Sequence, residues 1–431
     1  MSSGAVLAML GGEPISTERP PRWPCFDESD LSAVAEHMRR EELSAYEVVS
    51  GPLFEMEREL RERFQCEHAL LVNSCTAALY SALFGLGLRP GEEIVVPAIT
   101  YPGTAAVALH LGLVVRFADV DPETGNPGLP ELRNAMTERT RAVVLAHAWG
   151  LPPALHDVVP YLDRRGIPLI EDAARAFGTR CGGREVGSIG AVGCLSFHEL
   201  KAVPAGEGGV LLTSDRRVYE RAVALGHYFR CKDPHHLSLP DLLPYRHSSL
   251  GLNLKIHTIA ACVARRQLAR LDARLEAMAE NHALLGSLIG NEVDYRMQRT
   301  PPWAERVSRY GFNLHWRPTS RGAPSVATVV RALRAEGIHA STVGSPPLFR
   351  LPLFREPERS GLPGRVDGPR EDADFPGATE HATTLLRLPT LFSRNPEWIA
   401  RYAAALGKIY QNLNVLGEWE RGQSGDTHHG T

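Results

Sequence analysis

Residues 196–209 read S-F-H-E-L-K-A-V-P-A-G-E-G-G and join two short apolar runs. The first run, G-C-L-S-F, covers residues 193–197, and the second, G-V-L-L-T, covers residues 209–213. Apolar runs of this length are typical of strands that are buried on both faces of a sheet. Lys201 lies between them, just before a glycine-rich turn that allows close backbone approach to a bound group. A lysine in an ordinary loop is a solvated charge, whereas a lysine beside a buried strand end can bind a carbonyl group covalently.

The chain before this stretch alternates between short apolar runs and helix-like segments. Further apolar runs lie at residues 69–73, 93–97, 114–121, 142–147 and 167–172, and the clearest helix-like segments lie at residues 52–64 and 77–86. Strands that alternate with helices favour a mostly parallel sheet with helices on both faces. We therefore predict an α/β fold whose large domain, residues 1–260 with the N-terminal segment included, contains a mostly parallel seven-stranded sheet.

A second, smaller domain of the α+β class is predicted for residues 261–417. A long helix over residues 255–284 is expected to connect it to the large domain. Within the smaller domain we expect a strand at residues 310–316 and helices at residues 326–337 and 396–413. Residues 355–380 are rich in Pro, Gly, Glu and Arg, which predicts an exposed loop. The polar tail, residues 418–431, is predicted to be disordered.

The composition restricts the class of protein. With 431 residues, 43% of them hydrophobic, the chain is long enough for two domains. The formal net charge of −3 does not indicate a partner such as nucleic acid or an anionic membrane. The seven cysteines include no C-x-x-C pair, which argues against zinc-ribbon and thioredoxin folds and fits a reducing compartment. The N-terminus lacks the basic region of a signal peptide, and no apolar run has the length of a membrane span, so we expect a cytoplasmic protein.

Polar residues follow several of the apolar runs, at the edge of a parallel sheet where ligands usually bind. Asp172 ends one run, and a carboxylate there can cap the next helix or pair with a protonated ring nitrogen. The turn N-S-C-T at residues 73–76 precedes a helix, so it can cap that helix or bind a phosphate with its backbone N–H groups. Ser196 lies near the end of a third run. His147 and His198 also lie at strand ends, and we expect them to be hydrogen-bonded structural groups.

Taken together and in this order, these features resemble fold type I pyridoxal 5′-phosphate enzymes. In particular, the chain resembles the DegT/DnrJ/EryC1/StrS family of sugar and cyclitol aminotransferases, over about residues 11–413. The matching motifs are, in chain order, G-G-E-P, N-S-C-T-A-A-L, V-P-A-I-T-Y, F-A-D-V-D-P-E-T, E-D-A-A-R-A-F-G, V-G-S-I-G, S-F-H-E-L-K-A-V-P-A-G-E-G-G and G-L-N-L-K. The resemblance implies the fold of the aspartate aminotransferase superfamily and pyridoxal 5′-phosphate as the cofactor.

The resemblance also assigns roles to individual residues of this chain. Lys201 would form the Schiff base with the cofactor, and Asp172 would pair with the pyridine nitrogen. Tyr101 would stack on the face of the ring. The contacts around the phosphate would come from Ser74, Cys75, Thr76 and Ser196. Asn253, in G-L-N-L-K, would reach the phosphate in the neighbouring subunit, which implies a homodimer with shared active sites.

Three features of the chain depart from the family. Cys75 stands where glycine is usual, although its backbone N–H can still bind phosphate. Arg175 stands where glutamine or histidine is usual. Its permanent charge can face the 3′-oxygen of the ring, turn outward to a carboxylate or to solvent, or bind an acidic group of the substrate. Residues 308–316 and 344–355, in the small domain, also differ from the corresponding segments of many sugar aminotransferases.

The sequence therefore predicts a homodimeric aminotransferase that uses pyridoxal 5′-phosphate. It would move an amino group from glutamate or glutamine to a keto sugar or cyclitol in an antibiotic or surface-sugar pathway. Two alternatives remain open. A lyase or dehydrating aromatase such as aminohydroxybenzoate synthase keeps the lysine, so the motifs do not exclude it, and a regulatory protein can bind the cofactor without turnover. Lys201 gives no support to the dehydratase branch of the family, in which histidine replaces this lysine.

Overall fold

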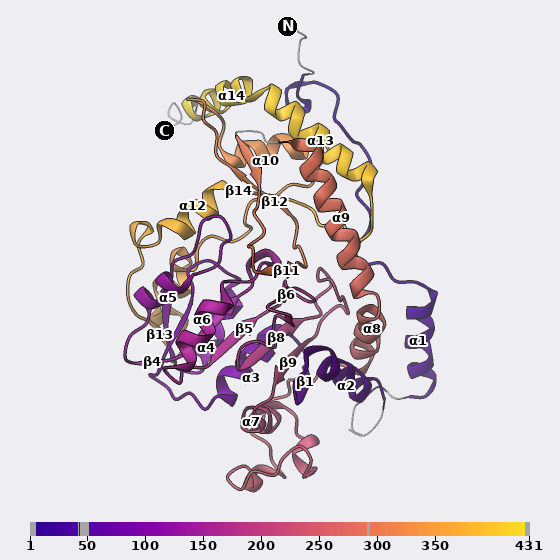
Figure 1. Cartoon of the computed structure of the whole chain (residues 1–431), viewed down its shortest axis with the longest axis vertical. Coiled ribbons are helices and arrows are strands. Elements are labelled where there is room, and N and C mark those ends of the chain that lie inside the picture. The colour runs from indigo at the N-terminus through magenta and orange to yellow at the C-terminus, as the bar shows by residue number, and fades with distance from the viewer. Residues whose placement is uncertain (1–5, 42, 44–50, 291–293, 427–431) are drawn as a thin grey trace.

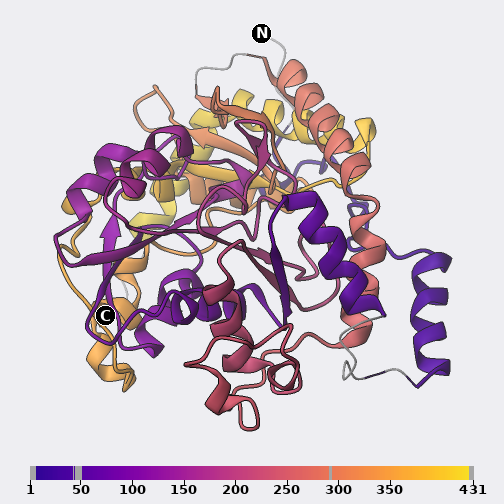
Figure 2. The ribbon, with the colours of Figure 1, turned by 60° about the horizontal axis from the view of Figure 1, so that its bottom comes forward.

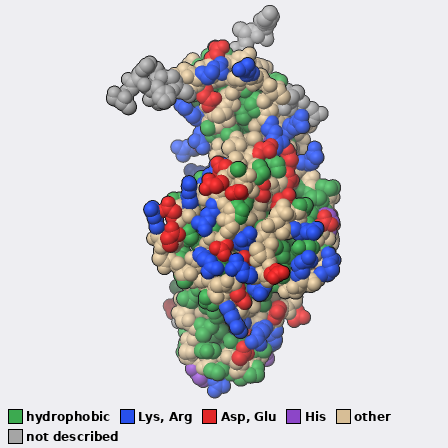
Figure 3. Space-filling view, turned by 90° about the vertical axis from the view of Figure 1, so that its left-hand side faces the viewer, with side chains coloured by type: hydrophobic (Ala, Val, Ile, Leu, Met, Phe, Trp, Pro, Cys, Tyr) green, Lys and Arg blue, Asp and Glu red, His purple; other side chains and the backbone are tan. Residues whose placement is uncertain are grey.

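The computed structural model of the chain describes residues 6–41, 43, 51–290 and 294–426. Figure 1 shows a large sheet wrapped by helices in the lower part of the molecule and a smaller sheet with long helices above it. On the face drawn in Figure 3, acidic and basic side chains are interspersed over the surface. This mixture agrees with the small net charge of the sequence.

Eight strands form the large sheet, in the order β1-β9-β8-β5-β4-β2-β3-β13. Their bounds are β1 His68–Val72, β2 Glu93–Pro97, β3 Val114–Ala118, β4 Thr140–Ala146, β5 Leu169–Asp172, β8 Val192–Ser196, β9 Gly209–Thr213 and β13 Arg365–Val366. All neighbouring strands are parallel except at β9, which runs antiparallel to both β1 and β8. The predicted fold class and the seven predicted strands are confirmed, and the sheet has one strand more than expected.

Helices cover both faces of this sheet. One face carries α3 (Cys75–Gly85), α4 (Pro102–His110) and α7 (Arg216–Gly226), and the other carries α2 (Pro52–Phe64), α5 (Leu129–Ala135), α6 (Leu155–Asp163) and α8 (Thr258–Leu268). Each face of the sheet has its own hydrophobic core, and alternate residues of a strand point to one core or to the other. In β1, Leu70 and Val72 belong to the core on the side of α3, and Ala69 and Leu71 belong to the core on the side of α2. Burial on both faces explains why these strands appear in the sequence as continuous apolar runs.

The prediction of an exposed loop at residues 355–380 is wrong. This segment contains β13 and the short helices η6 (Pro357–Ser360), η7 (Asp372–Asp374) and the start of α12 (Pro376–Thr384). Val366 and Phe375 are buried, and the ring centroid of Phe375 lies 6.2 Å from that of Phe117. A few apolar side chains thus hold a polar segment against the edge strand β3, and their wide spacing gives no periodic pattern in the sequence.

The C-terminal part of the chain is built on a three-stranded antiparallel sheet. Its strands are β10 (Tyr295–Met297), β12 (Phe312–Trp316) and β14 (Leu385–Leu388), in the order β10-β12-β14. The helices around the same core are α9 (Leu271–Ile289), α10 (Val326–Ala335), α13 (Pro396–Gln411) and α14 (Leu413–Asp426). The strand predicted at residues 310–316 and the helices predicted at residues 326–337 and 396–413 correspond to β12, α10 and α13.

The long helix predicted at residues 255–284 is instead two consecutive helices. The break between α8 and α9 falls at Ala269 and Arg270. The Arg270 guanidinium lies 2.8 Å from the Asp30 carboxylate, which belongs to α1 (Glu28–Arg39), the helix that rests beside α8 in Figure 2. Neither proline nor glycine stands at the break, so the sequence gives no indication of it.

The tail predicted to be disordered from residue 418 is helical as far as Asp426, because α14 continues through it. Glu420 fixes this helix by accepting hydrogen bonds from the backbone N–H of Ser325 at 2.8 Å and from the Thr328 hydroxyl at 2.6 Å. These contacts join α14 to the N-terminus of α10. The last part of the predicted tail, residues 427–431, lies outside the described residues.

Short elements complete the fold. The strands β6 (Arg180–Cys181), β7 (Arg184–Glu185) and β11 (Ala304–Arg306) form a third small sheet. The remaining helices are η1 (Ala8–Leu10), η2 (Ala148–Gly150), η3 (Arg230–Lys232), η4 (Leu243–Tyr245), η5 (Leu348–Arg350) and α11 (Pro352–Arg355). Within the described residues, no helix combines the length and the hydrophobicity that crossing a bilayer requires.

The first described residues pack on the C-terminal part of the chain. The buried Glu336 carboxylate accepts hydrogen bonds from the backbone N–H of Ala8 at 2.8 Å and of Ile15 at 3.1 Å. Lys408 of α13 donates to the same carboxylate at 2.8 Å and to the carbonyl of Glu13 at 2.6 Å. The N-terminal segment, which the predicted domain of residues 1–260 includes, is therefore held by the smaller of the two parts.

Substituting Lys408 with methionine should destabilise this part of the protein, because the buried Glu336 carboxylate would lose its counterion. Breaking a buried ion pair in this way typically costs about 3–5 kcal/mol. Arg394→Met removes an exposed partner of Glu280 and should cost about 1 kcal/mol or less. The free energy of unfolding of both variants, measured by urea titration with tryptophan fluorescence, checks this. Equal losses in the two variants would contradict it.

Candidate active site

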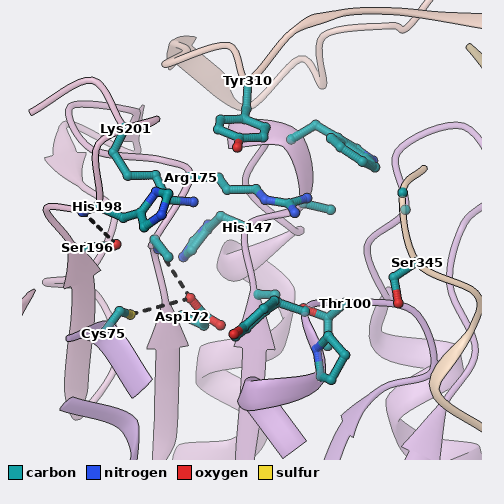
Figure 4. A pocket seen from close by; sticks show the side chains of 18 of the residues that line it. Cys75, Thr100, His147, Asp172, Arg175, Ser196, His198, Lys201, Tyr310 and Ser345 are labelled. Atoms are coloured by element: carbon teal, nitrogen blue, oxygen red, sulfur yellow. Dashed lines mark hydrogen bonds between the residues drawn. The ribbon is translucent and has the colours of Figure 1, made fainter. Parts of the chain in front are cut away.

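A cavity of about 680 Å³ lies at the carboxyl ends of the central strands of the large sheet. All of the predicted site residues except one line this cavity. The predicted residues that line it are Ser74, Cys75, Thr76, Tyr101, Asp172, Arg175, Ser196 and Lys201. The exception is Asn253, which is exposed and is not among the lining residues. The opposite wall comes from the C-terminal part of the chain, through Tyr310 and Ser345 (Figure 4) and through Arg387. The cavity therefore lies between the two sheets.

Lys201 lies in the connection between β8 and β9 and enters the cavity beneath Tyr310 (Figure 4). Its Nζ atom lies 4.8 Å from the centroid of the Tyr310 ring. Burial, and then the positive charge of Arg175, lower the pKa of Lys201 to about 8. A substantial fraction of this amine is thus neutral near physiological pH, and a neutral amine can act as a nucleophile or as a base.

Asp172 is the last residue of β5, and its buried carboxylate faces the same cavity. Oδ2 accepts a hydrogen bond from the Thr104 hydroxyl at 2.6 Å, and Oδ1 accepts one from the backbone N–H of Ala174 at 3.2 Å. The Cys75 thiol approaches Oδ1 at 3.9 Å. Burial and the neighbouring carboxylate raise the pKa of this thiol well above its usual value, so it stays protonated. These partners hold the carboxylate in one orientation.

The turn before α3 forms the cradle that the sequence suggests. Ser74 caps the helix, since its hydroxyl accepts a hydrogen bond from the backbone N–H of Ala77 at 3.0 Å. The capping explanation is therefore correct for this side chain, and Cys75 and Thr76 begin the helix at the cavity wall. Free backbone N–H groups at a helix N-terminus favour an anion such as a phosphate.

Gly209 allows the strand β9 to pass close to this turn. A Cβ atom at Gly209 would lie 2.6 Å from the backbone nitrogen of Cys75 and 2.8 Å from the carbonyl oxygen of Leu195. Any larger residue would have to displace the cradle or the neighbouring strand. On the other side of the cradle, Ser196 lines the cavity, and its hydroxyl accepts a hydrogen bond from the backbone N–H of His198 at 3.2 Å.

Arg175 lies inside the cavity between two aromatic rings. Its guanidinium carbon is 4.7 Å from the ring centroid of Trp149 and 4.8 Å from that of Tyr310. Burial and the positive charge of Arg387 lower the pKa of Arg175 from its ordinary value. The side chain does not turn outward, and no carboxylate among the described residues pairs with it.

His147 and His198 are hydrogen-bonded, as expected. His147 Nε2 lies 3.0 Å from the buried Glu171 carboxylate, which also accepts backbone N–H groups, among them that of Gly187 at 2.9 Å. Burial opposes the ionisation of Glu171, but the hydrogen bond from His147 and these N–H groups give a net lowering of its pKa. The carboxylate can only accept, so Nε2 carries the proton and leaves Nδ1 as an acceptor. His198 Nδ1 accepts the backbone N–H of Leu200 at 3.2 Å.

Trp149 has an uncommon backbone conformation, with φ 57° and ψ 16°, which is rare for a bulky residue. Its carbonyl accepts the backbone N–H of Tyr310 at 3.0 Å, and its indole N–H donates to Nε2 of His381 at 2.9 Å. Because the indole can only donate, His381 holds its own proton on Nδ1, which donates to the carbonyl of Pro122 at 2.8 Å. These contacts fix the aromatic walls of the cavity.

Comparison with known proteins gives the family. Residues 24–406 match the model of the DegT/DnrJ/EryC1/StrS aminotransferase family. This chain belongs to that family. It is 30% identical over 366 residues to the L-glutamine:2-deoxy-scyllo-inosose aminotransferase of Streptomyces kanamyceticus, with 82% of this chain and 84% of the relative covered.

Two further proteins are similar to this chain. The chain is 31% identical over 270 residues to the 3-amino-5-hydroxybenzoate synthase of Amycolatopsis mediterranei (strain S699), with 63% of this chain and 68% of the relative covered. The solved structure of DesI with its TDP-sugar product has a TM-score of 0.81 and 26% identity, covering 96% of this chain and 99% of that one. The predicted family and fold type are therefore confirmed.

Several lining residues of this family member were missed by the sequence analysis. They are Trp149, Tyr310, His381 and Arg387. Thr104, which lies behind the wall and holds Asp172 by a hydrogen bond, was also missed. Thr104 lies three residues after the motif V-P-A-I-T-Y, on the first turn of α4. This closeness to a recognised motif is a signal by which the sequence could have indicated it. The others come from separate elements, and no local motif marks them.

Tyr101 lies where the aromatic side chain of this family is expected, at the N-terminus of α4 and on the cavity wall. It is 59% exposed, so its ring is open to a ligand. A Cβ atom at Gly103 would lie 2.5 Å from the Tyr101 ring, so any larger residue would displace the ring from this position. Asn253 lies outside the cavity, although the backbone N–H of Asn73 donates to the neighbouring carbonyl of Leu254 at 2.8 Å.

The amine of Lys201 should react at a lower pH than an ordinary lysine, because its pKa is lowered to about 8. The substitution Arg175→Gln removes a neighbouring positive charge, so it should raise this pKa and move the reactivity profile to higher pH. The measurement is the rate of acylation of Lys201 in the cofactor-free protein across a pH series, followed by mass spectrometry. Arg394→Gln, which removes an exposed arginine outside the cavity, is the control and should leave the profile unchanged. A profile that does not move in Arg175→Gln would show that the amine does not sense the guanidinium.

Proposed function

We propose that this protein transfers an amino group from glutamine or glutamate to a keto group on a sugar or cyclitol, with pyridoxal 5′-phosphate as its cofactor. The observation that carries the proposal is the convergence of Lys201, Asp172 and the N-terminus of α3 in one cavity. An amine, a buried carboxylate and an anion-binding helix end are the three groups that this cofactor requires. Membership of the aminotransferase family supports the same conclusion.

The residues of the cavity fit the cofactor. Asp172 is a buried carboxylate that hydrogen bonds do not fully surround, so it can accept the proton of a pyridinium nitrogen. The N-terminus of α3 and Ser196 suit the phosphate. Lys201 supplies the amine for the aldehyde carbon, and the exposed ring of Tyr101 supplies a stacking surface. When bound, the cofactor provides an electron sink that stabilises negative charge at the substrate Cα.

The chain itself provides orientation and proton transfer. Thr104 and the backbone at Ala174 fix Asp172, so the carboxylate would receive the ring nitrogen of the cofactor without reorganising. Lys201, with a pKa near 8, can take up and return a proton at the substrate carbon. Trp149, which follows β4 of the large sheet, and Tyr310, from the C-terminal part, form an aromatic wall of the cavity. Such a wall restricts the access of water.

The relatives support the substrate class. One of them is named as an aminotransferase that pairs L-glutamine with 2-deoxy-scyllo-inosose, and the solved DesI structure holds a TDP-sugar product. We assign this chain to the same kind of reaction, in a specialised pathway that makes an antibiotic or a surface sugar. A small-molecule donor and acceptor are the partners that this assignment requires.

A second function is supported by the similarity to 3-amino-5-hydroxybenzoate synthase. A dehydrating aromatase uses the same lysine and needs no amino donor, so product analysis distinguishes it from a transaminase. A third function, that of a regulatory protein which binds the cofactor without turnover, remains open because of Arg175 and the divergent small domain, although the intact Lys201 and Asp172 argue against a degenerate copy.

The protein loaded with pyridoxal 5′-phosphate should show an absorbance band at about 410–430 nm. Adding glutamine or glutamate should replace it with a band at about 330 nm, the change expected of the cofactor in a transaminase. Lys201→Ala should lose the first band while the fold is kept, because the amine that binds the aldehyde is gone. Far-ultraviolet circular dichroism is the control for folding. A band that is indifferent to every donor would point to the aromatase or to the regulatory protein. Borohydride-stable attachment of the cofactor in Lys201→Ala would refute the role of Lys201.

We also propose that the protein is a homodimer in which Asn253 completes the phosphate site of the partner subunit. The exposure of Asn253 outside the cavity of its own subunit supports this. Its position next to Leu254, which hydrogen-bonds the cradle residue Asn73, places it near the edge of that cradle. A contact across a two-fold axis would bring such an edge residue to the neighbouring site.

Mixing two inactive variants tests this arrangement. Lys201→Ala and Asn253→Ala should each be inactive or weak as separate homodimers. In a mixed dimer one site receives both substitutions and the other receives neither, so random mixing should restore about a quarter of the sites. Activity after denaturing and refolding the mixture measures the recovery. No recovery would place Asn253 in its own subunit's site, and a fully active Asn253→Ala homodimer would remove it from catalysis.

A further inference from the structure

Two arginines from different sheets meet at the aromatic wall of the cavity. Arg175 follows β5 of the large sheet, and Arg387 belongs to β14 of the small sheet. The guanidinium carbon of Arg387 lies 5.7 Å from the ring centroid of Trp149 and 5.4 Å from that of Tyr310, the same two rings that flank Arg175. Two cations therefore share one pair of rings.

Neither guanidinium has a carboxylate partner among the described residues. Nε of Arg387 donates a hydrogen bond to the Ser341 hydroxyl at 3.1 Å. The acidic residues that line the cavity are Asp172 and Glu207. Asp172 is held by Thr104, and Glu207 lies on the side of His198, 3.9 Å from its Nε2. Two partly buried like charges repel each other, so the cavity stores an unfavourable interaction that an anion would relieve.

The surroundings hold these arginines in place. Trp149 keeps its left-handed backbone through its hydrogen bonds to Tyr310 and His381. On the other wall, the backbone of Arg387 is paired with Ser341 in both directions, at 2.7 Å and 2.9 Å. A site built this way loses little conformational entropy when a ligand binds.

The cofactor phosphate is not the natural partner of this pair. In Figure 4 the guanidinium of Arg175 lies on the opposite side of Asp172 from Cys75 and Ser196, which belong to the phosphate cradle. The 3′-oxygen of the cofactor ring can face Arg175, but one oxygen atom does not fill the forks of two arginines. An anion that joins Arg175 and Arg387 would thus belong to a substrate. The planar guanidinium fork matches a carboxylate with two parallel hydrogen bonds.

We propose that Arg175 and Arg387 bind a carboxylate of the amino acceptor, so that the acceptor is a cyclic keto acid rather than a neutral keto sugar. The inference rests on the proposed transaminase function. In that reaction the amino acid donor brings its own carboxylate and then leaves, and the acceptor enters the same cavity. A neutral acceptor would leave Arg387 without an anionic partner in the second half of the cycle. An acidic acceptor would take the place of the donor carboxylate, so that the cations are paired in both halves.

Binding of a matched pair of ligands tests the proposal. Quinate, a hydroxylated cyclic carboxylate, and quinamide, its neutral amide, are titrated by calorimetry into the protein loaded with pyridoxal 5′-phosphate. Quinate should bind at least about 10-fold more tightly, which is the scale of a charge-assisted bidentate contact. The preference should fall to near one in Arg387→Gln and in Arg175→Gln. Arg387→Lys should keep part of it, and the exposed control Arg394→Gln should keep all of it.

The outcomes separate this inference from the proposed function. Equal affinity of the wild type for quinate and quinamide, while glutamine still changes the absorbance of the cofactor, would overturn the acidic acceptor and leave the transaminase. If the substitutions weaken only the saturation by glutamine, the arginines serve the donor carboxylate alone and the inference is also wrong. A quinate preference that is lost in the folded Arg387→Gln and Arg175→Gln variants supports it, whatever glutamine does. Thermal melting of each variant confirms that a lost preference is not a loss of fold.

Discussion

The buried carboxylate of Asp172 is the group around which the cavity is organised. A charge removed from water is costly unless hydrogen bonds and an opposite charge compensate for it. Thr104 and the backbone of Ala174 supply the hydrogen bonds, and the cationic ring nitrogen of pyridoxal 5′-phosphate is suited to supply the charge. Because Asp172 ends β5, between β4 and β8, the parallel sheet that builds the fold also places this carboxylate at the ligand-binding edge.

The rest of the cavity is divided by charge. One end offers the N-terminus of α3 to a phosphate, and the other presents Arg175 and Arg387 between aromatic rings. Burial and the charge of Arg175, the nearest of these cations, lower the pKa of Lys201. In the arrangement that we propose, the groups that select a substrate would therefore also set the proton affinity of the amine, through electrostatics rather than through direct contact.

Local sequence was sufficient for the part of the site that lies in short motifs at strand ends, such as Lys201, Asp172 and the turn at residues 73–76. It was insufficient for Tyr310 and Arg387, because these residues reach the cavity only through the packing of the small sheet against the large one. The fold followed the same division. Apolar runs revealed the central strands, whereas β13 and α14 depend on a few widely spaced contacts with distant elements, which a periodicity argument does not detect.

The hydrogen bonds between the N-terminal segment and Glu336 cannot form early in the synthesis of the chain. Ala8 leaves the ribosome well before its hydrogen-bonding partner Glu336, which lies 328 positions later, and Lys408 comes later still. The N-terminal segment therefore has nowhere to dock while the large sheet is being translated. Its native contacts form only after Glu336 and Lys408 have been synthesised, and until then its apolar side chain Leu7, which is buried in the folded protein, is available to chaperones.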